Sequence, residues 1–207
     1  ESVYRGVEYR DGALYMATDG SHKHCYCMGK ATGCDHTVVE WVAWESTNTL
    51  PTSGNYYLLN DIELSAETSI SSNVSICLNG HTVKAADGKR HISTVKNSGA
   101  SIVLCDCTAK TENGVYTAGK LIGGIDKSGN TGGGSLYIRA GSKLELFDGI
   151  ITGNYSTLVG GAIAFNGASE FTMHGGEISG NKVKAGGAVY TAGGDAGFTG
   201  SQVNLYG

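Results

Sequence analysis

Between residues 133 and 190, apolar and polar residues alternate in short runs that recur along the chain. In one run a glutamate separates Leu144 from Leu146, and in the next a threonine separates Phe171 from Met173. Alternation with a period of two predicts a β-strand that buries one face. Because Gly, Asn and Ser separate the runs, the pattern predicts short strands joined by tight corners.

The runs belong to a repeat with a nearly constant period. Gly-Gly pairs begin at Gly133, Gly160 and Gly186, so the spacing is 27 and then 26 positions. The dipeptides at 153–154 and 180–181 are both Gly-Asn and are again 27 positions apart. A fixed period of about 20 to 50 residues indicates a solenoid, in which each repeat buries its apolar face against its neighbours.

Three short strands in each repeat of ~27 residues predict a parallel β-helix. A leucine-rich repeat has a similar period but needs a helical outer segment, and GGGS, NYSTLVGG and NKVKAGG lack helical apolar spacing. We therefore expect an all-β chain: a right-handed parallel β-helix with a small N-terminal cap that contains Cys and His. Residues 1–51 are the expected cap, and residues 52–207 are the expected coils. The final QVNLYG predicts another strand just begun, so we expect the coils to continue in a longer protein.

The tetrapeptides GGAI and GGAV, which begin at Gly160 and Gly186, resemble the repeats of chlamydial polymorphic outer-membrane proteins. More broadly, residues 70–207 look like the β-helix repeats of large surface proteins of gut Firmicutes. The spacing H-T-x-x-x-W-x-x-W from His36 to Trp44 is similar to a segment that precedes such repeats. These resemblances imply a β-helix on an extracellular, cell-surface protein with an adhesin-like role.

Composition refines the picture of the corners. Glycine makes up 33 of the 207 residues, which is about twice the usual share of ~7%. Its fixed places in the repeat predict corners that need positive φ or a close backbone approach.

Charge argues against one class of partner. The net charge is −4, whereas a nucleic-acid groove needs clustered Lys and Arg. Lys182 and Lys184 are the only close pair of lysines in the repeats, and we interpret them as part of a solvated face. No apolar run is long enough to span a membrane, so we expect no direct membrane insertion by this segment.

A stretch rich in Cys and His stands before the repeats, SHKHCYCMGKATGCDH at residues 21–36. Two Cys or His residues lie on each side of its turn-like MGKATG segment: Cys25 and Cys27, then Cys34 and His36. If the two arms form a β-hairpin, residues two apart share a face, so the four side chains converge. Three thiolates and an imidazole are a ligand set that structural zinc uses. In this register His22 and His24 point to the other face, and a one-residue slip would reverse them.

The remaining cysteines fall in the expected first coils. Aligning SICLNG at 75–80 with SIVLCD at 101–106 places Ile76 over Ile102 and displaces Cys77 from Cys105 by two positions. With strands ~4.8 Å apart and a rise of ~3.3 Å per residue, the two Cα atoms would lie roughly 8 Å apart. This exceeds the ~7 Å limit for a disulfide without backbone movement, but it suits two ligands of one metal.

We therefore expect a second zinc site built from Cys77, Cys105 and Cys107, completed by His81 or by a histidine of the cap. The alternative is disulfides without metal, because a surface protein lives in an oxidising compartment and six cysteines is an even number. The zinc sites are expected to be structural rather than catalytic, because a ligand-saturated site has no open position for water.

The expected fold also hosts polysaccharide enzymes of the pectate-lyase-like class, both lyases and glycoside hydrolases. Glycoside hydrolysis needs carboxylates paired on one face. At the offset of the repeat, these acids do not stack on one another: Asp126, Asp148, Glu170 and Glu177. No phosphate-binding loop, dinucleotide fingerprint or G-x-S-x-G motif is present. No catalytic residue is therefore assigned.

The sequence predicts a non-catalytic, surface-exposed β-helix module that acts as an adhesin-like binder or a stalk, with a cap held by structural zinc. The expected partner is a host or plant glycan or a surface protein. The alternative function is a polysaccharide-processing enzyme whose catalytic residues lie in corner loops or beyond Gly207. Exposed aromatic residues on a flat face would favour binding, and a groove lined by acids would favour an enzyme.

Overall fold

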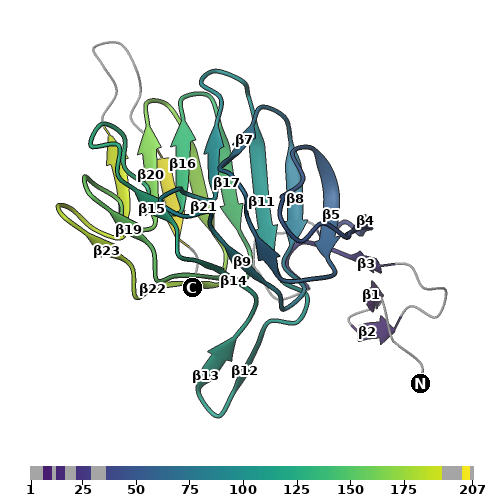
Figure 1. Cartoon of the computed structure of the whole chain (residues 1–207). Helices are drawn as coiled ribbons and strands as arrows, with labels where there is room; N and C mark the ends of the chain where they lie inside the picture. The colour runs from purple at the N-terminus through teal and green to yellow at the C-terminus, as the bar shows by residue number, and fades with distance from the viewer. Residues whose placement is uncertain (1–6, 11–12, 17–21, 29–35, 193–201, 206–207) are drawn as a thin grey trace.

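The computed structural model describes residues 7–10, 13–16, 22–28, 36–192 and 202–205. Within these residues every regular element is a strand, so the prediction of an all-β chain is confirmed. The described part of the chain contains no helix with the length and hydropathy that crossing a membrane requires. The strands form several sheets, and the larger ones are built mainly from parallel strands (Figure 1).

The main sheet is the largest and has eight strands in the described residues. Its first strand, β3, pairs antiparallel with β4, and the following pairs are all parallel. In spatial order the strands are β3 (His22–His24), β4 (Val39–Trp44), β5 (Gly54–Leu58), β8 (Val74–Cys77), β11 (Ser101–Cys105), β17 (Lys143–Leu146), β21 (Glu170–Met173) and β25 (Gln202–Leu205).

Three further sheets are parallel throughout, and one antiparallel pair lies near the N-terminus. The second sheet contains β7 (Thr68–Ile70), β10 (Ile92–Thr94), β16 (Leu136–Arg139), β20 (Ile163–Asn166) and β24 (Val189–Ala192). The third sheet contains β6 (Ile62–Glu63), β9 (Thr82–Lys84), β14 (Lys120–Ile122), β18 (Ile150–Thr152) and β22 (Glu177–Ser179). The corner sheet contains β15 (Ile125–Asp126), β19 (Tyr155–Ser156) and β23 (Lys182–Val183). The N-terminal pair is β1 (Val7–Arg10) with β2 (Ala13–Met16).

Neighbouring strands in the later part of each sheet come from successive sequence repeats. In the main sheet Lys143 pairs with Glu170, and in the third sheet Ile151 pairs with Ile178, both at an offset of 27 positions. In the second sheet Ile163 pairs with Val189, at an offset of 26 positions. The period of the Gly-Gly pairs is therefore the spacing between paired strands, and Glu170 lies beside a lysine rather than beside another acid.

The interior lies between the main, second and third sheets and is filled with aliphatic and aromatic side chains. Ile102, Leu144 and Phe171 form one inward row across β11, β17 and β21, and none of them is more than 1% exposed. Burying such a side chain contributes about 1.5–3 kcal/mol. Each repeat therefore stabilises the next through rows of this kind.

Glycines occupy corners where a Cβ atom has no room. Gly133 and Gly160 take the same place in successive repeats, with φ of 74° and 61°. A Cβ on Gly133 would collide with the backbone oxygen of Leu136, and one on Gly160 would collide with that of Ile163. The repeat keeps glycine here because the backbone is left-handed and closely approached.

A hairpin leaves the parallel sheets between β11 and β14 and projects at the lower side of Figure 1. Its strands, β12 (Lys110–Glu112) and β13 (Val115–Thr117), pair antiparallel around Asn113 and Gly114, which both have positive φ. Tyr116 fastens the hairpin to the sheets. Its hydroxyl donates to Asp148 Oδ1 at 2.9 Å and accepts from the Gly149 N–H at 3.1 Å.

Candidate metal centre

The outer face of the main sheet carries a second, smaller core. Ile76 and Leu104 point into the interior, so the next residues in their strands, Cys77 and Cys105, point to the outer face. Residues 25–28 cover this face and contribute two cysteines and a tyrosine to the same core. The N-terminal segment thus lies over the ends of β8 and β11, where three cysteines of the later chain are found.

Among the described residues, seven Cys and His side chains gather there in two clusters, each able to hold a metal ion. The His2Cys2 cluster consists of His22, His24, Cys77 and Cys107. The Cys2His cluster consists of Cys25, Cys27 and His36. Within each cluster the potential ligand atoms all lie within 4.8 Å of one another.

Strand β3 brings both histidines to the His2Cys2 cluster. Alternation along the strand places His22 and His24 on one side and Lys23 on the other. The ring of His22 stacks on Tyr57 with centroids 3.9 Å apart, and the ring of His24 stacks on Trp41 with centroids 4.6 Å apart. These stacking contacts orient each imidazole ring.

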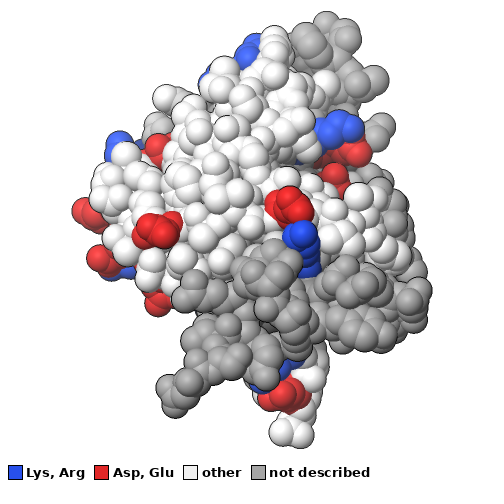
Figure 2. Space-filling model, turned by 90° about the vertical axis from the view of Figure 1, so that its right-hand side faces the viewer, with Lys and Arg blue, Asp and Glu red and all other residues white. Residues whose placement is uncertain are grey.

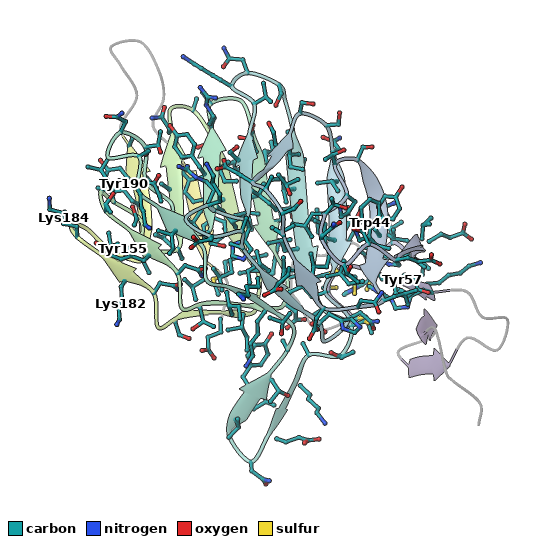
Figure 3. The ribbon with its side chains drawn as sticks, in the orientation of Figure 1. Trp44, Tyr57, Tyr155, Lys182, Lys184 and Tyr190 are labelled. Carbon is teal, nitrogen blue, oxygen red and sulfur yellow. The ribbon has the colours of Figure 1, made fainter. Side chains whose placement is uncertain are left out.

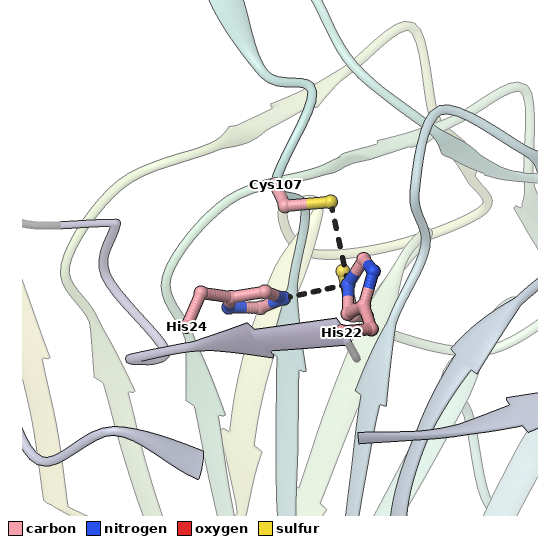
Figure 4. Close-up of side chains that lie close together, drawn as sticks. His22, His24 and Cys107 are labelled. Carbon is pink, nitrogen blue, oxygen red and sulfur yellow. Dashed lines mark hydrogen bonds between the residues drawn. The ribbon is translucent and has the colours of Figure 1, made fainter. Parts of the chain in front are cut away.

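The spacing of the donor atoms fits a tetrahedral metal. Zinc with Zn–S of ~2.3 Å and Zn–N of ~2.0–2.1 Å places S and N roughly 3.5 Å apart and two N atoms roughly 3.3 Å apart. The Nε2 atom of His22 lies 3.0 Å from Nε2 of His24 and 3.7 Å from Sγ of Cys107 (Figure 4). Both distances are close to the edges of a zinc tetrahedron.

Neighbouring groups hold His24 in the state that a metal ligand needs. Its Nδ1 lies 2.8 Å from the carbonyl oxygen of Cys25, so the proton sits on Nδ1 and the lone pair of Nε2 faces the cluster. The indole N–H of Trp41 donates to the backbone oxygen of His24 at 3.1 Å. Burial lowers the pKa of His24 to about 4, so the ring is neutral at pH 7.

Without a bound metal, the thiols of Cys77 and Cys107 favour the protonated state. Burial raises the pKa of Cys77, and the hydrogen bond with Cys77 raises the pKa of Cys107. Cys107 also donates to Asn79 Oδ1 at 3.2 Å. A divalent cation reverses this preference, because its charge favours thiolate. A metal bound at this cluster would therefore release protons on binding and bind more tightly as the pH rises.

The Cys2His cluster has similar spacing. Sγ of Cys25 and Sγ of Cys27 are 3.6 Å apart, close to the roughly 3.8 Å edge of a zinc–sulfur tetrahedron. Nδ1 of His36 lies 3.2 Å from the sulfur of Cys27 and 4.0 Å from that of Cys25. The fourth residue of the first predicted site, Cys34, lies outside the described residues.

The second predicted site is assembled differently from the expectation. Cys77 and Cys107 meet the histidines of β3, and Cys105 is not part of that cluster. The predicted two-position displacement of Cys105 is wrong, because Cys105 pairs directly with Cys77 in the sheet. His81 lies elsewhere, with its Nδ1 3.2 Å from Asp61 Oδ1.

The predicted alternative of disulfides has no counterpart among the described cysteines, because no two of their sulfurs lie at bonding distance. The sulfurs of Cys25 and Cys27 are 3.6 Å apart, which is far longer than an S–S bond of ~2.05 Å. The cysteines of the two clusters thus stand at ligand spacing rather than at bonding distance.

From the sequence, either His81 or a histidine of the cap could complete the second site. The sequence His22-Lys23-His24 points to the histidines of the cap, because alternate residues of a strand lie on one face. Recognising that strand requires its partner β4, which does not begin until Val39.

Comparison with models of known protein families, with curated proteins and with solved structures found no match for this chain.

Proposed function

We propose that this chain is a non-catalytic, surface-exposed module built as a right-handed parallel β-helix, whose N-terminal segment is fastened by structural zinc. The module acts as a stalk or as an adhesin-like binder of a host or plant glycan or of a surface protein. One observation carries the proposal. His22 and His24 of the N-terminal segment meet Cys77 and Cys107 at tetrahedral spacing, with donors that zinc prefers.

The arrangement of the sheets supports the β-helix part of the proposal. Three sheets, parallel except for the β3–β4 pair, surround one core, and in the last repeats their paired strands come from successive copies of the repeat. Rows of buried side chains and glycine corners recur at the same spacing. A solenoid is the architecture in which each repeat contacts its neighbours in this way.

The fastening role is supported by the size of the free energies. The cluster joins residues 24 and 77, which are 53 positions apart, through a small second core. Structural zinc contributes an apparent binding free energy of about 10–16 kcal/mol in zinc-finger peptides. A whole domain is stable by only about 5–15 kcal/mol, so a zinc ion is able to decide whether the N-terminal segment stays docked.

For the alternative of a glycoside hydrolase, the structure offers carboxylates in a cavity, but their pKa values are lowered rather than raised. Asp61 and Glu63 line a cavity of about 630 Å³ on the third sheet, together with Lys84. A backbone hydrogen bond from Thr82 lowers the pKa of Asp61, and the hydrogen bond with Lys84 lowers the pKa of Glu63. A general acid needs a raised pKa, so these two carboxylates are poorly suited to protonate a leaving group.

Elemental analysis of protein purified without chelator tests the fastening. We expect between one and two zinc ions per chain, about one for each occupied cluster. His22→Ala should lower the content by about one, because it removes a ligand of the His2Cys2 cluster.

His81→Ala is the matched control, because His81 contacts Asp61 away from both clusters. Its zinc content should equal that of the wild type. A wild type without zinc, or an equal loss in the two variants, would contradict the proposal.

A further inference from the structure

The lysines of the described residues fall into two groups. Four of them form ion pairs with a carboxylate: Lys23, Lys84, Lys110 and Lys143. Of the described lysines that form no ion pair with a described residue, three belong to the corner sheet or directly follow its strands: Lys127, Lys182 and Lys184. All three are exposed. Lys89, Lys96 and Lys120 also form no such ion pair, and they lie outside the corner sheet.

Strand alternation turns this group toward solvent on one face. The inner residues of β15 and β19 are buried, so their neighbours Lys127 and Tyr155 point outward. Tyr155 pairs with Lys182 across β19 and β23, and Lys184 follows on the same side. Figure 3 shows Lys182 and Lys184 projecting from the molecule on the side where Tyr155 lies. These four residues, Lys127, Tyr155, Lys182 and Lys184, form the lysine face.

The charges of the lysine face act together. Lys182 and Lys184 are alternate residues, roughly 7 Å apart, and Lys127 lies two strands away from them, roughly 10 Å. These separations are comparable to the Debye length of ~8 Å at physiological ionic strength. The acids of the adjoining hollow, Asp126 and Glu67, are both engaged by Arg90, at 2.6 and 3.5 Å. The face therefore keeps a positive potential, although the net charge of the chain is −4.

The surroundings add to the face. Lys127 and Lys89 both line the hollow beside it, which has a volume of about 250 Å³. Tyr155 is 38% exposed and is the one aromatic residue among the large apolar side chains that are exposed in the described residues. By contrast, on the side of the molecule seen in Figure 2, acidic and basic side chains lie close to one another.

We propose that the lysine face binds a linear acidic polysaccharide that carries carboxylates along its length. Such a chain presents successive anionic groups to Lys127, Lys182 and Lys184, and the ring of Tyr155 packs against the apolar side of a sugar. A neutral glycan would leave the lysines without counter-charges. A nucleic acid is the competing polyanion, and poly(dT) is its probe in the test below. The inference rests on the binding role proposed above and does not depend on the metal clusters.

Affinity electrophoresis with alginate in the gel tests the proposal, with dextran as the uncharged comparison. Alginate should retard the wild type and dextran should not. The variant K127Q/K182Q/K184Q should bind alginate at least tenfold more weakly. Tyr155→Ala should weaken binding by about threefold, because it removes the ring and leaves every charge in place.

The control variant K84Q/K110Q/K143Q removes the same charge from lysines that already have a carboxylate partner. Its affinity should change less than twofold. No retardation of the wild type by alginate, or equal weakening in the two triple variants, would overturn the lysine face as the site. Binding of single-stranded poly(dT) as tight as that of alginate would overturn the polysaccharide as its ligand.

Zinc content, measured on the same preparations, separates the two proposals. Normal zinc without alginate binding contradicts the lysine face alone. Alginate binding without zinc contradicts the fastening of the N-terminal segment alone.

Discussion

At the residue scale, His91 is a fully buried imidazole with both ring nitrogens engaged. Its Nε2–H donates to the carbonyl oxygen of Val83 at 3.0 Å, and its Nδ1 accepts from the hydroxyl of Ser135 at 2.9 Å. Burial lowers the pKa of His91 from 6.5 to about 4. The folded protein therefore holds the ring neutral at a pH where the unfolded chain begins to protonate it.

We expect this residue to make folding sensitive to acid. Between pH 6.5 and pH 4 the unfolded chain takes up a proton on His91 and the folded chain does not, so the free energy of unfolding falls as the pH falls. The loss is on the order of 3 kcal/mol at most. Urea unfolding in EDTA at pH 7.5, 6.5, 5.5 and 4.5 measures the combined loss from His91 and from His24, whose pKa burial also lowers to about 4, without a contribution from metal release.

His91→Gln is the comparison. It should be less stable than the wild type at pH 7.5, because it leaves buried partners unsatisfied, but it should lose less stability on acidification. Identical pH dependence in the two proteins would show that His91 is not responsible.

At the scale of elements, two asparagines join successive repeats at the corner after the third sheet. Asn154 is 1% exposed, and its Oδ1 accepts from the N–H of Gly124 at 2.8 Å. Its Nδ2 donates to Oδ1 of Asn181 at 2.8 Å, and Nδ2 of Asn181 donates to the carbonyl oxygen of Ile151 at 2.7 Å. The recurring Gly-Asn dipeptides thus form a ladder of amides from one repeat to the next.

Asn154→Ala should lower the free energy of unfolding by about 2–4 kcal/mol, because it leaves the buried N–H of Gly124 without its acceptor and opens a small cavity. Chemical denaturation measures the change. Asn130→Ala is the control, since Asn130 is exposed in a loop, and its effect should stay below about 0.5 kcal/mol. Equal effects would argue against the ladder as a stabilising element.

The sequence identified the elements more reliably than it aligned them. The register of β17 with β21 follows from the regular period, since Lys143 pairs with Glu170 at the offset of the Gly-Gly pairs. The register of β8 with β11 is shifted by two from the alignment of SICLNG with SIVLCD, because Val74 pairs with Ile102. A shift of two keeps every side chain on its face. The hydrophobic pattern therefore cannot distinguish the two registers, and the irregular early corners decide between them.

At the scale of the whole molecule, we expect a chelator to loosen the N-terminal segment selectively. EDTA should raise amide hydrogen exchange at residues 22–28 and 39–44 by at least tenfold, because the His2Cys2 cluster joins this segment to β8 and to the chain after β11. Exchange in β17 and β21 should change less than twofold, because their contacts lie within the parallel sheets.

Added zinc should reverse the effect in the wild type but not in Cys107→Ser, which lacks one ligand. Loosening that spreads equally through all the sheets would show that the metal supports the whole fold rather than the docking of one segment.

The lysine face is also a product of the whole molecule. Lys127 and Lys184 are 57 positions apart in the sequence, and only stacking of the repeats places them on one face. Along the chain the lysines are scattered, so the sequence by itself indicates only that Lys182 and Lys184 belong to a solvated face.

The sequence by itself determined the all-β class, the short strands, the period and the glycine corners. These features depend on neighbouring residues and on a repeat that occurs several times in the chain. It also singled out the cysteines as ligand candidates. Only the tertiary structure decided which potential ligands lie together. His22 and His24 lie close to Cys77 and Cys107, whereas Cys105 pairs with Cys77 in the sheet but is not part of the cluster. Such a meeting depends on the register of distant strands and on where the N-terminal segment lies over the sheet, and no local pattern specifies either.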